Sequence, residues 1–147
     1  MGSFTIELKG ADKLITKFEN MSRKMEKEVK NSVKKHTFEM ETRAKKKAAY
    51  KSGHLKRSIH SDFYNRGLSG EVSTNLFYAP MIEYGTPPHK IKAKGGALKF
   101  KIGGNTIFAK SVNHPGTRAR PFMFPAFLVT RSAFTRDLHR IMRDVVD

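Results

Sequence analysis

The chain has 147 residues, enough for one domain with a modest core. It carries 29 Lys and Arg against 13 Asp and Glu residues, a net charge of +16, and contains no cysteine. The lack of cysteine excludes disulfides, thiolate metal sites and cysteine nucleophiles. No apolar run approaches the roughly 18 residues that a membrane span needs. So basic a surface predicts binding to a phosphate polymer or to an acidic protein.

The N-terminal third predicts a short strand followed by a long helix. Residues 4–8 alternate between apolar and polar, as in a strand. From residue 12 to about 50 there is no Gly or Pro, and apolar residues recur every three or four positions, as on one face of a helix. His36 lies on this face and is expected to be a core or interface residue rather than a ligand. A break near Ser22 is compatible with the pattern, because serine can cap a second helix.

The next segment predicts a hairpin and a helical turn. Residues 59–64 alternate as a strand, 65–70 have the composition of a turn, and 71–74 begin the return strand. Pro80 is placed to open a short helix and Gly85 to end it.

No carboxylate occurs between Glu83 and Asp137. Within this stretch, residues 86–96 contain two prolines, two glycines and three lysines, which predicts an exposed, flexible basic loop. The strands of a second hairpin are expected at 98–102 and 106–112. A helix is expected from about 125 to 145, because Phe127, Phe134, Leu138, Ile141 and Val145 form an apolar face at helical spacing.

Together these elements predict an α+β fold. We expect a long N-terminal helix and a C-terminal helix to pack on one face of an antiparallel sheet of about four to five strands. All of residues 1–147 are expected to form a single domain, with 86–96 as its flexible loop.

The sequence contains no convincing catalytic or metal-binding constellation. Its six histidines are scattered without the spacing of metal ligands. Glu7-Leu8-Lys9 is similar to the acid-x-Lys signature of metal-dependent nucleases, with Asp62 or Glu71 as a second carboxylate. Such short strings are common in any lysine-rich chain. We therefore expect a protein that is not an enzyme and has no cofactor.

Basic residues alternate with aromatic ones around Phe100 and Phe108, a pattern found in nucleic-acid-binding strands. Strand alternation more simply places Phe100 in the core, with Lys99 and Lys101 pointing outward. A stand-alone basic nucleic-acid-binding module with nonspecific phosphate contacts is the alternative function.

Three motifs occur in a fixed order after the lysine-rich helix. They are Ser52-Gly53-x-Leu55-x-x-Ser58-Ile59, Tyr78-Ala79-x-x-x-Glu83-Tyr84-Gly85-Thr86 and Ala119-Arg120-Pro121-Phe122-Met123-x-Pro125-Ala126. As an ordered set they resemble the small neck or tail-completion proteins of long-tailed bacteriophages, the family similar to minor tail protein Z of phage lambda. The resemblance covers roughly residues 5–145.

This resemblance implies a structural protein of the virion neck or upper tail, made in the bacterial host cytoplasm. It would complete the tail and join it to the DNA-filled head. Its partners would be other copies in a homo-oligomeric ring, with a hexamer as one candidate, and head-completion, tail-terminator or tail-tube proteins. Double-stranded DNA would pass through without sequence-specific contacts, and no membrane is involved.

Two groups of residues are candidates for these contacts. Basic residues expected to reach a neighbour or to face the DNA are Lys90, Lys92, Lys94, Arg118 and Arg120. Apolar residues expected to pack the core first and to contact other subunits second are Tyr78, Met81, Tyr84, Phe122, Met123 and Phe124.

Overall fold

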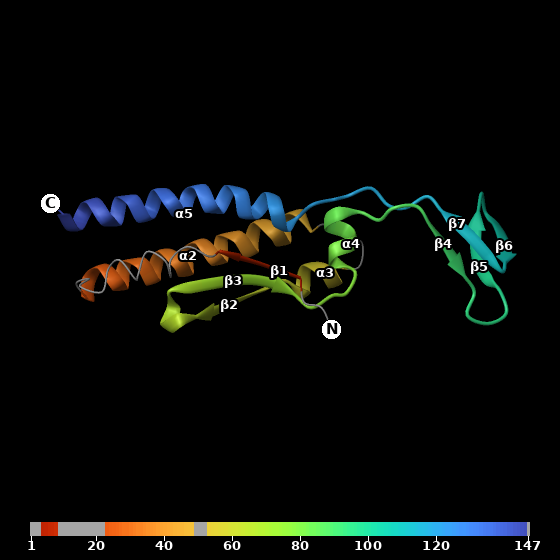
Figure 1. The fold of residues 1–147 in the computed structure, drawn as a ribbon, viewed down its shortest axis with the longest axis horizontal. Coiled ribbons are helices and arrows are strands. Elements are labelled where there is room, and N and C mark those ends of the chain that lie inside the picture. Colours follow the sequence, from red (N-terminus) through yellow and green to blue (C-terminus); the bar gives the residue numbers. More distant parts are fainter. Residues whose placement is uncertain (1–3, 9–22, 49–52, 147) are drawn as a thin grey trace.

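The computed structural model describes residues 4–8, 23–48 and 53–146 and shows an elongated molecule (Figure 1). Two long helices lie side by side with a small sheet below them, and an arm of β-strands projects along the long axis. The predicted helix before Arg23, with its expected break near Ser22, lies outside the described residues.

The elements follow the predicted order. The described helices are α2 (Arg23–Lys47), α3 (His54–Ser58), α4 (Ala79–Tyr84) and α5 (Met123–Val146), with a 3-10 turn η1 at Asn65–Gly67. The described strands are β1 (Phe4–Leu8), β2 (His60–Tyr64), β3 (Ser69–Thr74), β4 (His89–Lys92), β5 (Leu98–Ile102), β6 (Asn105–Ala109) and β7 (Ser111–His114). The sequence did not predict α3, which lies just beyond the expected end of the long helix at about residue 50.

Helices α2 and α5 run antiparallel and pack through the apolar faces that the sequence predicts (Figure 1). The buried side chains between them are Met25, Val29, Val33, Phe134, Leu138 and Ile141. His36 is also buried there, and its Nε2 lies 2.9 Å from Asp137 Oδ2 on α5. The expectation that His36 is a core residue is confirmed.

A three-stranded antiparallel sheet, in the order β1-β3-β2, lies against α2. The predicted hairpin is formed by β2 and β3, which turn at η1. The second buried cluster lies where α2, the sheet, α3, α4 and the start of α5 meet. It contains Met40, Ala44, Ala48, Leu55, Ile59, Val72, Ala79, Phe122, Met123 and Ala126.

We call residues 87–116 the arm and the remaining described residues the body. In the arm, β4 pairs with β7 and β5 pairs with β6, each pair forming a separate two-stranded ribbon. The hairpin at 98–102 is confirmed. The expectation of an unstructured loop at 86–96 is corrected, because this segment contains β4, whose partner β7 lies about twenty residues later. The expected strand 106–112 is divided between β6 and β7.

The α+β class with its two long helices is confirmed, but the strands do not form one sheet of four to five. Three belong to the body and four to the arm ribbons. Lysines at alternate positions of β4 and β5 leave one face of each strand charged, which opposes packing under the helices. Phe100, expected in the core, is half-buried in the arm instead.

Candidate functional site

Two of the sequence motifs, Tyr78–Thr86 and Ala119–Ala126, meet where the arm joins the body. We call this junction the root of the arm. Glu83, at the end of α4, is buried, and its carboxylate accepts three backbone N–H groups from the start of α5. Oε2 accepts from Phe122 at 2.8 Å and Met123 at 2.9 Å, and Oε1 accepts from Phe124 at 2.8 Å. The first amides of a helix lack intrahelical acceptors, and the helix dipole favours a negative charge there. Glu83 therefore caps α5 and ties it to α4.

The two chain segments that carry the arm are paired at this root. The backbone N–H groups of Thr86 and Thr117 each donate to the other residue's carbonyl at 3.0 Å. Gly85 and Gly116 flank the pair with φ values of 73° and 87°, which favour glycine. A Cβ on Gly85 would lie 2.4 Å from the Thr117 carbonyl oxygen, so there is no room for a side chain. We call the Thr86–Thr117 pair and its two glycines the stalk.

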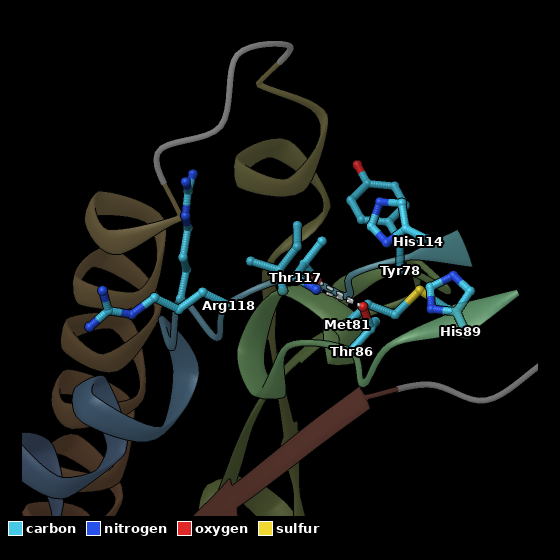
Figure 2. Close-up of a pocket in the computed structure, with 9 residues that line it drawn as sticks. Tyr78, Met81, Thr86, His89, His114, Thr117 and Arg118 are labelled. Carbon is cyan, nitrogen blue, oxygen red and sulfur yellow. Dashed lines mark hydrogen bonds between the residues drawn. The ribbon is translucent and has the colours of Figure 1, made fainter. Parts of the chain in front are cut away.

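A groove of about 750 Å³ opens beside the stalk (Figure 2). It is lined by Tyr78, Met81, Ile82, Thr86, His89, His114, Thr117, Arg118 and Arg120. The α4 side contributes apolar groups, the arm side contributes two imidazoles, and Arg118 and Arg120 add positive charge. The groove is therefore suited to apolar or anionic groups rather than to a cation.

His89 and His114 face each other across β4 and β7, with their ring centroids 5.0 Å apart. His89 Nδ1 lies 2.9 Å from the Pro87 carbonyl oxygen and must donate to it. His114 Nδ1 accepts from the Gly116 N–H at 3.0 Å. Each ring is thus fixed by the backbone beside it. Sequence reasoning missed this pair because it depends on the register of two distant strands.

The basic residues predicted to be functional are all exposed. Lys90 and Lys92 lie on β4, and Lys94 follows it. Arg118 and Arg120 lie between the stalk and α5, and the Arg120 N–H donates to a carbonyl of α4 at 2.7 Å. The structure therefore places the five residues in two groups, one on the arm and one at its root.

The apolar residues predicted to make subunit contacts divide by burial. Phe122 and Met123 are fully buried in the body core, and Tyr78 packs against that core. These three serve the core packing that the sequence analysis placed first, and Phe122 and Met123 are not accessible to another subunit. The exposed members are Met81, Tyr84 and Phe124.

One aromatic residue that the prediction did not include extends this surface. Phe77 is 77% exposed, Tyr84 is 68% exposed and Met81 is about half-exposed. Met81 and Tyr84 are three residues apart on one side of α4, and Phe77 lies in the turn that leads into this helix. We call Phe77, Met81 and Tyr84 the root patch. Phe124 lies nearby, since its N–H bonds to the neighbouring Glu83.

Each ribbon of the arm has a charged face and an apolar face. In the β5–β6 ribbon, register places Lys99, Lys101, Thr106 and Phe108 on one face. The other face carries Leu98, Phe100, Ile102, Ile107 and Ala109. In the β4–β7 ribbon, Lys90 and Lys92 share one face, and Ile91 and Val112 share the other. The arm contains six lysines and no carboxylate, and none of its residues is buried.

The carboxylates of the nuclease hypothesis lie on the body sheet. Register places Glu71 opposite Glu7 on one side and opposite Asp62 on the other, whereas Lys9 lies outside the described residues. Among the described side chains, no group of three or more His, Cys, Asp or Glu residues is arranged to hold a metal ion. No helix in the described ranges has the length and apolarity required to span a membrane.

A protein-family model described as "Bacteriophage HK97-gp10, putative tail-component" matches residues 12–85. The matched span covers α2, the β2–β3 hairpin and α4, and it ends at the glycine before Thr86. Comparison with curated proteins and with solved structures gave no match.

Proposed function

We propose a place in the virion neck for this chain, which belongs to the HK97-gp10 family of bacteriophage tail components. Membership confirms the phage-tail resemblance of the sequence motifs, and a tail component is a structural part of the virion. In our proposal the chain completes the tail and joins it to the DNA-filled head as one subunit of a ring. This role requires no reaction and no cofactor.

The arm is the observation that carries the proposal. It has six lysines, no carboxylate and no buried residue, so it contributes nothing to the body core. A projecting segment of this kind has little apolar burial of its own and gains stability from contact with another molecule. In a ring of identical subunits, the arm would reach the next subunit while its lysines face the central passage.

The basic residues suit contact with double-stranded DNA that must move. Lys90, Lys92 and Lys94 on the arm, with Arg118 and Arg120 at its root, attract phosphates without reading bases. Exposed lysines hold phosphate as mobile point charges, because they lack the planar fork of arginine. Such contacts permit the genome to slide through the ring.

The root patch supports a protein partner beside the DNA. Large aromatic side chains as exposed as Phe77 and Tyr84 are costly in water and mark interaction surfaces. We propose that Met81, Tyr84 and Phe124 contact a neighbouring subunit or an adjoining neck protein, such as a head-completion, tail-terminator or tail-tube protein.

Electron microscopy of a lysate from the parent phage with this gene disrupted tests the neck assignment. We expect filled heads and tails lying apart, or tails with abnormal upper ends. Intact, infectious virions would refute the assignment. Complementation with the intact gene is the control, because it must restore joined particles.

A charge-reversal variant tests the arm directly. We expect Lys90→Glu with Lys92→Glu and Lys94→Glu to impair head–tail joining or DNA retention while the far-ultraviolet circular dichroism is unchanged. The matched control reverses three exposed lysines of α2, Lys24, Lys27 and Lys46, and changes the net charge equally. Full infectivity of the arm variant would refute its role.

The net charge of +16 also favours the alternative, a stand-alone nucleic-acid-binding module. That function predicts DNA binding by the isolated protein that weakens steeply between two salt concentrations. It also predicts that particles assemble normally when the gene is disrupted. The neck assignment predicts instead that disruption of the gene leaves heads and tails apart, or tails with abnormal upper ends.

A further inference from the structure

We propose that the apolar face of the β5–β6 ribbon docks on the root patch of a second copy of this chain. The inference rests on the proposed function, since it names the contact that would join ring subunits. It pairs two surfaces that the chain leaves uncovered, one on the arm and one on the body.

The arm surface requires a cover. Two-stranded ribbons are marginally stable in water when nothing packs on them. The apolar face of β5–β6 carries Ile102, which is 60% exposed, and Ile107, which is more than a third exposed. Leu98 and Phe100 on the same face are only half-buried. Association with another protein surface would remove these side chains from water.

The root patch requires a cover of similar size. An aromatic side chain can bury about 150–250 Å², so Phe77, Met81 and Tyr84 at their observed exposure leave a few hundred Å² of surface uncovered. This is a substantial part of the roughly 800 Å² that each partner buries in a standard interface. The residues flanking the patch can supply the remainder.

The chain's own arm is held away from the root patch. The stalk pairs Thr86 with Thr117, and Gly85 and Gly116 lie so close to the opposite segment that an added Cβ would meet its backbone. Figure 1 shows β5 and β6 at the end of the arm farthest from α4. A ribbon that covers the root patch must therefore come from another molecule.

A second copy satisfies both surfaces with one kind of contact. If the root patches of two copies packed against each other, α4 would be covered but both arms would stay exposed. If the arm of one copy packs on the root patch of another, both kinds of surface are covered. Such a contact joins unlike surfaces, so it repeats from copy to copy and closes into a ring when the rotation permits.

Charge also favours this contact. The apolar face of β5–β6 carries no ionisable residue, so its lysines stay on the opposite, exposed face. On the body, Glu83 already accepts three N–H groups, and Arg118 and Arg120, which line the groove beside Met81, are exposed. The arm therefore brings no charge of its own into the contact, and its lysine face remains free for DNA.

Disulfide trapping tests the contact, because the chain has no cysteine of its own. We would mix full-length Ile102→Cys protein with full-length Met81→Cys protein and oxidise mildly. The matched control replaces the first protein by Lys101→Cys, one residue away on the opposite face of β5. A disulfide requires Cα atoms within about 7 Å, so we expect at least roughly tenfold more Ile102→Cys heterodimer than Lys101→Cys heterodimer.

The products are distinguished by mass on a non-reducing gel and by peptide mass spectrometry. Equal heterodimer yields from the two arm variants would overturn the inference. Predominant Met81→Cys homodimers would also overturn it and assign the patch to symmetric pairing. Protection of the Ile102→Cys thiol from alkylation by duplex DNA, without any heterodimer, would assign the apolar face to DNA instead.

This result is separable from the neck assignment. Heads and tails that lie apart after gene disruption, together with no specific heterodimer, would retain the neck role and reject the arm contact. A specific heterodimer combined with fully infectious gene-disrupted phage would retain the arm contact and reject the neck role.

Discussion

The body and the arm bury their apolar residues in different ways. In the body, residues spaced three or four apart on α2 and α5 meet in clusters from which water is excluded. In the arm, the strands have five residues or fewer, apolar residues alternate with lysines on β4 and β5, and no residue is buried. The body therefore holds its fold within one chain, whereas the arm leaves its apolar residues in contact with water. Substitutions should therefore affect folding strongly in the body and weakly in the arm.

The largest loss of stability is expected at Glu83, which joins α4 to the start of α5. Glu83→Gln replaces one of two accepting oxygens by an NH₂ group that faces a backbone donor. We expect a loss of about 3–5 kcal/mol in the free energy of unfolding, because buried amides of α5 are left unpaired. Urea unfolding followed by circular dichroism measures it. Glu28→Gln, on the surface of α2, should cost less than about 0.5 kcal/mol; equal costs for the two variants would contradict the capping role.

A smaller, pH-dependent effect is expected between α2 and α5. Burial alone would raise the pKa of Asp137, but a hydrogen bond from His36 and the charges of Lys35, His36 and Arg140 outweigh it, and the pKa lies below its ordinary value. A lowered pKa in the folded state contributes stability above the unfolded pKa of about 3.9, and this contribution is lost as pH falls through the folded value. Asp137→Asn should cost about 1–2 kcal/mol at pH 7.

The cost of Asp137→Asn should shrink when unfolding is measured near pH 3. Asp144→Asn is the control, because Asp144 is more than half exposed and lies about two turns farther along α5. A cost for Asp137→Asn that is independent of pH would show that the carboxylate does not contribute through its charge.

A modest gain is expected at Thr130, a buried residue of α5 whose hydroxyl has no hydrogen-bond partner. Thr130→Val keeps the shape and removes the unsatisfied group, so thermal unfolding should show a gain of about 0.5–1 kcal/mol. Thr37→Val is the contrast, because the Thr37 hydroxyl donates to the Val33 carbonyl at 2.8 Å. Equal responses of the two variants would mean that the Thr130 hydroxyl is satisfied in solution.

The smallest effect is expected in the arm. Ile102→Ser and Phe108→Ser should each change the unfolding free energy of dilute, monomeric protein by less than about 0.5 kcal/mol. Ile141→Ser in the body should cost several times more, because Ile141 is buried between α2 and α5. Calorimetry at low protein concentration measures the unfolding free energy of the three variants. Arm variants as costly as Ile141→Ser would show that the arm is part of the folded core.

The sequence predicted well those features that depend on local pattern. Helical spacing indicated α2 and α5, alternation indicated the β2–β3 and β5–β6 hairpins, and Pro80 and Gly85 marked the ends of α4. It missed β4, because a strand of four residues is recognised by its partner, and β7 follows only after an intervening hairpin. It also did not predict that the Glu83 carboxylate accepts N–H groups at the start of α5. That contact depends on the path of the whole arm, which lies between the two in the sequence.

For the candidate lysines, the sequence correctly predicted exposure. A run of lysines without carboxylates must be exposed, and the structure places all of them on the surface. The apolar candidates could not be sorted by pattern alone. Phe122 and Phe124 have similar neighbours in the sequence. They point in different directions at the start of α5, so Phe122 is buried and Phe124 is half-exposed.

The stalk has a consequence for how members of this family can diverge. The chain leaves the body at Thr86 and returns at Thr117, two residues that are hydrogen-bonded to each other. A segment inserted between neighbouring positions can lengthen, shorten or be exchanged without moving the elements around it. The family match ends at residue 85, immediately before this junction. The match does not extend to α5 either, although α5 belongs to the body. Because both ends of the arm meet at the stalk, its length can change while the body elements on either side of the stalk keep their places.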